Sequence, residues 1–202
     1  MFTHTYRSTN PATPKELHCF FATLTDKGHV NQEKVPFKIS QNGRLVLVTC
    51  EQETPLAAVE LETNRFERLR SAKALAYSFA TGAHVSVQGE LAYSVHKTGS
   101  NKKLCPVDAR GELKRELREA FLAYLTRATG VDCASAHAAG MLALAWEDRS
   151  SPQDKVWLND VITLNLVGAV VCADTVNQLA VKSVGRRRSY GLGALQVSVI
   201  EE

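Results

Sequence analysis

The fold is decided by a predicted β-hairpin at residues 35–50, which read VPFKISQNGRLVLVTC. Val35–Ser40 and Arg44–Cys50 are short runs with the composition typical of extended strands. An Asn-Gly pair, Asn42-Gly43, lies between them and suits the tight turn of an antiparallel hairpin. The sequence therefore predicts two neighbouring antiparallel strands.

A strand and a helix are predicted before this hairpin. Phe2–Arg7 can form a short strand, and a helix is expected over residues 15–25. Thr13 followed by Pro14 is a favourable pair for the N-cap and the first helical position. The helix has one apolar face, made by residues at offsets of three, four and seven: Leu17, Phe20, Phe21 and Leu24.

Two further elements complete a first unit. Residues 55–70 contain a helix candidate, and Leu75, Tyr77 and Phe79 alternate as in a strand with one buried face. The order β-α-β-β-α-β predicts a ferredoxin-like domain over residues 1–82.

The second half repeats this order of elements. The expected elements are strands over residues 85–95, a helix over 112–129 ended by Gly130, strands within 156–171, a helix over 174–184 and a strand over 195–200. Residues 134–146 remain open, because their composition favours a helix and their place in the repeat calls for a strand. The chain is thus predicted to be an α+β protein with two ferredoxin-like (RRM-like) domains in tandem, the second over residues 83–202.

Composition limits the possible functions. The 24 Lys and Arg against 21 Asp and Glu give a net charge of only +3, so any nucleic-acid site must be a local cluster of charge. Neither the five cysteines nor the six histidines have metal-ligand spacing, so no metal, cofactor or disulfide framework is predicted. Neither a secretory signal nor an 18-residue apolar run is found, so we expect a cytoplasmic protein without a membrane partner.

The segment 184–195, VGRRRSYGLGAL, has the strongest local signal for binding. Glycines allow a backbone to approach phosphates closely, and Arg186, Arg187 and Arg188 provide forked donors for phosphate oxygens. The alternative from local sequence is a solvated cluster of charge beside a simple turn.

This segment resembles the glycine-rich loop of CRISPR repeat-processing RNA-binding proteins, in particular the CasE-type endoribonucleases. The matching run is Arg188, Ser189, Tyr190, Gly191, Leu192, Gly193, Ala194 and Leu195. Residues 17–24, LHCFFATL, resemble the first helix of the same family, whose histidine is catalytic. The resemblance departs at Ser183, where the family often has a glycine, and at Lys15, where it often has a tyrosine.

The resemblance implies a metal-independent endoribonuclease that cuts the repeat hairpin of precursor CRISPR RNA at its 3′ base, leaving a 2′,3′-cyclic phosphate and a 5′-hydroxyl. It implies catalytic roles for His18 and, by position, Lys15. RNA contacts would come from Arg186, Arg187, Arg188, Ser189, Tyr190, Gly191 and Gly193. Other CRISPR-associated proteins of a multisubunit surveillance complex are the implied partners.

His18 fits acid–base chemistry because imidazole titrates near neutral pH, but a histidine on an apolar helix can also be structural. A second basic loop contains Lys97, Lys102 and Lys103 and is either an RNA contact or a solvated loop. Two other functions stay open: a noncatalytic RNA-binding subunit, and a ferredoxin-like module that binds a small molecule or a protein. His4 on the first strand is a further residue that would approach the site.

Overall fold

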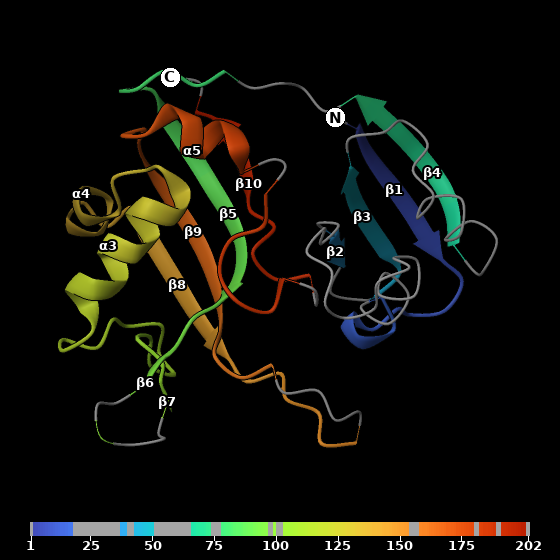
Figure 1. The fold of residues 1–202 in the computed structure, drawn as a ribbon, viewed down its shortest axis with the longest axis horizontal. Helices are drawn as coiled ribbons and strands as arrows, with labels where there is room; N and C mark the ends of the chain where they lie inside the picture. Colours follow the sequence, from blue (N-terminus) through green and yellow to red (C-terminus); the bar gives the residue numbers. More distant parts are fainter. Residues whose placement is uncertain are drawn as a thin grey trace.

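The computed structural model describes residues 2–17, 37–39, 43–50, 66–73, 78–96, 99, 103–153, 158–179, 182–188 and 191–200. Two four-stranded antiparallel sheets dominate these residues (Figure 1). The first sheet has the order β2-β3-β1-β4 and consists of β1 (Phe2–Ser8), β2 (Phe37–Ile39), β3 (Leu45–Cys50) and β4 (Phe66–Lys73). The second has the order β10-β5-β9-β8 and consists of β5 (His84–Ala92), β8 (Leu142–Glu147), β9 (Val161–Ala169) and β10 (Gln196–Val199).

The two sheets have the same topology. Counted in chain order within each sheet, the first strand (β1 or β5) lies between the fourth (β4 or β10) and the third (β3 or β9). The second strand (β2 or β8) lies at one edge. This order confirms the tandem ferredoxin-like fold expected from the sequence. The boundary at residue 82 remains a prediction.

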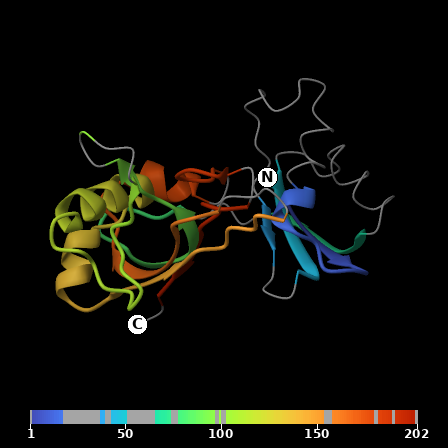
Figure 2. The same cartoon turned by 90° about the horizontal axis from the view of Figure 1, so that it is seen from below.

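Helices accompany the second sheet. They are α3 (Arg118–Thr129), α4 (Cys133–Ala138) and α5 (Ala173–Gln178). Helices α3 and α4 lie on the side of this sheet that faces away from the first sheet (Figures 1 and 2). A short hairpin, β6 (Val95–His96) with β7 (Lys103–Leu104), follows β5.

Each sheet has its own buried cluster. The larger cluster lies between the second sheet and its helices and contains Phe121, Leu125 and Leu164, all fully buried. The smaller cluster, which we call the first core, contains Tyr6, Ala12, Leu17, Phe37, Val46, Val48 and Phe66. Leu17 is 1 % exposed and Phe37 is 2 % exposed, so the start of the first helix and the edge strand β2 are packed in the same core.

The predicted helix start at Thr13 is confirmed. Residues 14–17 are helical, and the backbone N–H of Leu17 donates to the Thr13 carbonyl. Thr13 and Glu16 form a capping box, because the Thr13 N–H donates to Glu16 Oε2 at 2.8 Å and the Glu16 N–H donates to Thr13 Oγ1 at 3.2 Å. The remainder of this predicted helix, residues 18–25, lies outside the described residues.

Two expectations were wrong in the first half. Of the helix candidate within residues 55–70, residues 55–65 lie outside the described residues. The helix does not extend to residue 70, because residues 66–70 form the start of β4, which pairs with β1. This edge strand exposes most of its side chains, so it lacks the apolar alternation by which a strand is usually identified. Phe79, expected in a strand, belongs to no strand and packs into the core of the second sheet.

The helix predicted over residues 112–129 begins six residues later than expected. Val107 and Leu113 form an isolated bridge, and the Asp108 carboxylate accepts the backbone N–H groups of Arg110 and Glu112. This local turn uses the residues that periodicity alone assigned to the helix. Gly130, with φ of 75°, ends α3 as predicted.

The open segment 134–146 contains both element types, α4 and then β8, separated by a turn at Gly140. Helix α5 ends at Gln178, short of the expected residue 184. No helix among the described residues is long and apolar enough to cross a bilayer.

The packing of α3 on the second sheet predicts the stability effect of a core substitution. Phe121→Ala should lower the free energy of unfolding by about 3 to 5 kcal/mol, because it leaves a cavity in a fully buried site. Leu69→Ala, at a side chain 40 % exposed on β4, should change it by less than about 0.5 kcal/mol. Urea unfolding followed by circular dichroism measures both, and equal effects would contradict the described core.

Candidate RNA-binding and cleavage site

The glycine-rich loop, residues 183–195, is anchored to strand β5. The Val184 N–H donates to the Gly193 carbonyl at 2.8 Å, and the Gly193 N–H donates to the Glu90 carbonyl at 2.5 Å. The Arg186 N–H donates to the Ala92 carbonyl at 3.4 Å. The two arms of the loop are therefore held against each other and against the end of β5, while Ser189 and Tyr190 at its tip lie outside the described residues.

Two of the loop's glycines are required by close contacts. Gly193 has φ of 80°, and a Cβ at this position would overlap the Val184 carbonyl oxygen. Gly191 has φ of 84°, and its Cβ would lie 2.8 Å from Cε2 of Phe37, which belongs to the first sheet. The loop thus contacts both sheets, and its described part lies between them in two perpendicular views (Figures 1 and 2).

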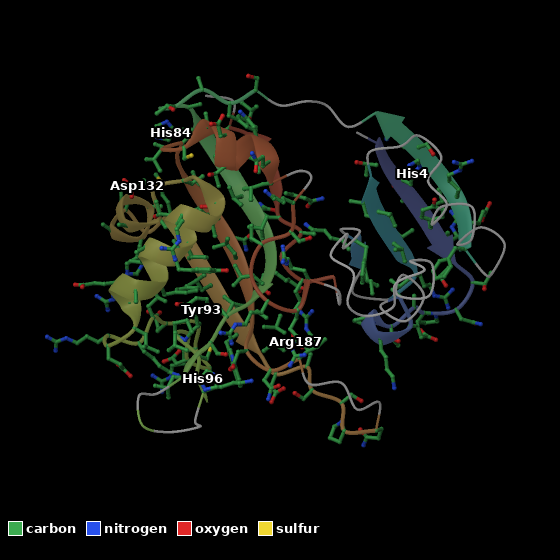
Figure 3. The ribbon with its side chains drawn as sticks, viewed as in Figure 1. His4, His84, Tyr93, His96, Asp132 and Arg187 are labelled. Atoms are coloured by element: carbon green, nitrogen blue, oxygen red, sulfur yellow. The ribbon has the colours of Figure 1, made fainter. Side chains whose placement is uncertain are left out.

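The three arginines have different surroundings. Arg186 and Arg187 are exposed, and Arg187 has a left-handed backbone with φ of 58° (Figure 3). Arg188 is partly buried, and its Nη1 donates to the Ser183 carbonyl at 3.4 Å. Ser183 is 8 % exposed, and its backbone carbonyl is the acceptor for Arg188.

An aromatic cluster that the sequence analysis missed supports the loop. The rings of Tyr93 and Tyr124 have centroids 4.4 Å apart, and Tyr93 also packs on Phe121 at 4.9 Å. A Cβ at Gly185 would lie 3.1 Å from the Tyr124 hydroxyl. Burial raises the pKa of Tyr124, and the nearby cations, which include Arg186 and Arg188, oppose this shift. The arginines therefore lie close to a partly buried phenol.

A charge network includes Glu90, the residue whose backbone carbonyl accepts the hydrogen bond from Gly193. Arg149 binds Glu90 through two hydrogen bonds of 2.8 and 2.6 Å, and its Nε donates to Glu147 at 2.6 Å. The hydrogen bond to Glu90 is the main cause that raises the pKa of Arg149 above its usual value. Lys38 of β2 is within electrostatic range of the same glutamate. These residues are far apart in sequence, and no local pattern identifies them.

The second basic loop is only partly described. Lys103 is exposed on β7 and pairs with His96 of β6. Lys97 and Lys102 lie outside the described residues. The RNA contact proposed for Lys103 is compatible with its exposure.

The structure describes one of the two catalytic candidates. Lys15 lies in the first helical turn and is partly buried. His18 lies outside the described residues, and it directly follows Leu17, which is buried in the first core. His4 is fully buried on β1, and its Nδ1 is 2.9 Å from Ser71 Oγ. His4 is therefore a core residue and is not accessible to RNA.

Among the described residues, no cluster of His, Cys, Asp and Glu has the arrangement of a metal site. The groups that the structure brings together are cations and a phenol. Such donors suit an anionic ligand with phosphate oxygens.

Comparisons with known proteins agree with this fold. No protein-family model and no curated protein matches the sequence. The CRISPR-associated protein Cas6e from Escherichia coli K-12 superposes with a TM-score of 0.62 at 14 % identity, over 99 % of this chain and 100 % of that chain. Thermus thermophilus Cse3 bound to an RNA that represents a pre-cleavage complex gives a TM-score of 0.60 at 15 % identity, over 98 % of each chain. A chain of a CRISPR RNA-guided surveillance complex gives 0.60 at 12 % identity, over 99 % of this chain and 100 % of that chain. The chain is thus similar over nearly its whole length to the Cas6e and Cse3 endoribonucleases, and it has their fold.

Proposed function

We propose that the chain is a metal-independent endoribonuclease that binds the repeat hairpin of precursor CRISPR RNA and cleaves at its 3′ base. Solved structures with this fold include CRISPR endoribonucleases, among them complexes with a 19-nucleotide RNA and with a pre-cleavage RNA. The cationic loop between the two sheets supports the same function for this chain.

One observation carries the proposal. Gly191 of the glycine-rich loop lies against Phe37, and Phe37 shares the first core with Leu17. His18 is the next residue after Leu17. The contact of Gly191 with Phe37, and the core that Phe37 shares with Leu17, therefore connect the loop that would bind RNA to the helix that would carry the catalytic histidine.

In the proposed reaction, the RNA 2′-hydroxyl attacks the adjacent phosphate and the 5′-oxygen leaves. The 2′-hydroxyl must lose a proton and the 5′-oxygen must gain one. His18 carries out one of these two transfers, since an imidazole can act as acid or base near neutral pH, and water carries out the other. The ammonium of Lys15 stabilises the negative charge that develops on the phosphate. The products are a 2′,3′-cyclic phosphate and a 5′-hydroxyl, and the RNA backbone supplies all the atoms of the new bond.

Recognition of the hairpin would depend mainly on shape and phosphate contacts, because the deep major groove of duplex RNA is poorly accessible to side chains. The exposed guanidinium groups of Arg186 and Arg187 suit phosphate oxygens. Lys97, Lys102 and Lys103 would add contacts from the β6-β7 hairpin. We further propose that the protein acts in the cytoplasm and keeps its product as a subunit of a surveillance complex, by analogy with the structural neighbour that belongs to such a complex.

The catalytic assignment predicts that His18→Ala separates binding from cleavage. In the presence of a chelator, wild type should cut a labelled repeat hairpin, and His18→Ala should cut it about 10² to 10⁴ times more slowly. Its affinity for the RNA should be nearly unchanged, because the imidazole acts only on the reacting atoms. Lys15→Ala should also slow cleavage, by a smaller factor. Single-turnover rates and gel-shift titrations measure both quantities.

Normal cleavage by His18→Ala would show that the assigned catalyst is wrong. Tight binding by wild type with no cleavage would instead support a noncatalytic RNA-binding subunit.

The binding assignment predicts a specific loss when Arg186, Arg187 and Arg188 are all changed to Ala. Affinity should fall, and the slope of log affinity against log salt should become shallower by about one for each lost phosphate contact. The matched control changes Arg110, Arg115 and Arg118 to Ala, which removes the same charge from positions outside the loop. Equal losses for the two triple variants would contradict a local site.

The loop conformation predicts that Gly193→Ala impairs RNA binding without loss of charge. The new Cβ would overlap the Val184 carbonyl, so the two arms of the loop must separate. Gly140→Ala is the matched control, because Gly140 has a similar φ of 71° and no atom within 4 Å of its Cβ position. A fluorescence-anisotropy titration should show weaker binding for Gly193→Ala than for Gly140→Ala, and equal affinities would refute the role of the loop backbone.

A further inference from the structure

Lys38 is a partly buried cation with no direct partner. It lies on the edge strand β2 and, among the residues that the structure describes, its ammonium makes no ion pair or hydrogen bond. A desolvated ammonium without such a partner is unfavourable, because burial penalises the charged form. A site of this kind requires an explanation.

The register places Lys38 on the face of the first sheet opposite the first core. Phe37 pairs with Val48, and both side chains point into the first core. Successive residues of a strand point to opposite faces, so Lys38 and its neighbour Leu47 lie on the other face. Lys38 is therefore directed away from the first core.

The carboxylate that attracts Lys38 is already bound within the protein. Glu90 attracts Lys38 electrostatically but is not in ion-pair contact with it, and Glu90 is bound by both terminal nitrogens of Arg149. Glu90 also lies on the face of its sheet opposite the buried Val87 and Leu91. Helices α3 and α4 cover the other side (Figures 1 and 2). Lys38 therefore lies outside this network of paired charges and makes no ion pair among the described residues.

The glycine-rich loop passes beside this cation. Gly191 lies against Phe37, the residue before Lys38, and the Gly193 N–H is bonded to the Glu90 carbonyl. The three consecutive arginines belong to the same loop. An anionic chain bound along this loop would pass the position of Lys38.

We infer that Lys38 is a further RNA-binding residue, whose ammonium contacts a phosphate oxygen of the RNA held by the glycine-rich loop. This inference rests on the proposed function. A lysine suits a phosphate as a compact point charge with three donors. The phosphate would supply the partner that the protein itself does not provide.

The surroundings of Lys38 give the inference a distinctive pH dependence. Burial lowers the pKa of Lys38 to about 8, and Glu90 opposes this shift only in part. Above this pH much of the amine is neutral in the free protein, whereas a bound phosphate favours the ammonium. RNA binding should therefore take up a proton above the pKa, and affinity should fall as the pH rises through it. Glu90 is the charged group that acts on Lys38 in the free protein, and it attracts the ammonium.

The test compares Lys38→Met and Lys38→Arg with wild type, using a labelled repeat hairpin at neutral pH and at about pH 9. Lys38→Met should bind about tenfold more weakly at neutral pH, as expected for one lost charge-assisted contact. Lys38→Arg should lose less affinity than wild type between the two pH values, because a guanidinium does not titrate there. Calorimetry in two buffers with different ionisation enthalpies should show proton uptake for wild type alone.

Lys182→Met is the matched control, since this lysine is exposed and its ammonium bonds to Gln178, four residues earlier in the chain. If wild type binds and cuts RNA while Lys38→Met shows the same affinity and pH profile, the inference is wrong and the proposed function stands. If wild type itself does not bind the hairpin, the proposed function fails and the role of Lys38 fails with it. Should Lys38→Met not fold, an unchanged pH profile of Lys38→Arg would still overturn the inference.

Discussion

The close approach of Gly193 to Val184 and to strand β5 is the constraint on which the candidate site depends. Only a residue without a side chain fits between these backbones, and the hydrogen bond from its N–H to Glu90 fixes the loop on the second sheet. Once this crossing is made, Gly191 can lie against Phe37 of the first sheet. The close approach of Gly193 to Val184 and β5 thus determines where the arginines, the supporting aromatic cluster and the contact between the sheets lie.

This geometry gathers arginines locally in a protein whose net charge is only +3. Arg149 is bonded to both Glu90 and Glu147 beside the loop, so the Glu90 carboxylate is already engaged within the protein. Lys38 of the first sheet follows Phe37, which contacts the loop that carries Arg186. A local excess of positive charge of this kind is what a polyanionic ligand requires.

Much of the fold could be predicted from the sequence, and the failures have identifiable physical causes. The Asn42-Gly43 hairpin, the cap at Thr13 and the stop at Gly130 are local signals, and all agree with the described elements. Strand β4 was misassigned because an edge strand is held by backbone pairing and needs no apolar pattern. In the site, the glycine-rich loop could be identified from adjacent residues. Tyr124, Arg149 and Lys38 could not, because their roles arise from contacts between segments far apart in the chain.

The measurement that most directly tests the central claim is cleavage of a repeat hairpin in which the nucleotide at the proposed cut carries a 2′-deoxyribose. With a chelator present, we predict that wild type binds this RNA as tightly as the all-ribose hairpin but cuts only the latter, because the 2′-hydroxyl is the attacking group. The all-ribose product should end in a 2′,3′-cyclic phosphate. Cleavage of the 2′-deoxy hairpin, or cleavage only after a divalent metal is restored, would contradict the proposed mechanism.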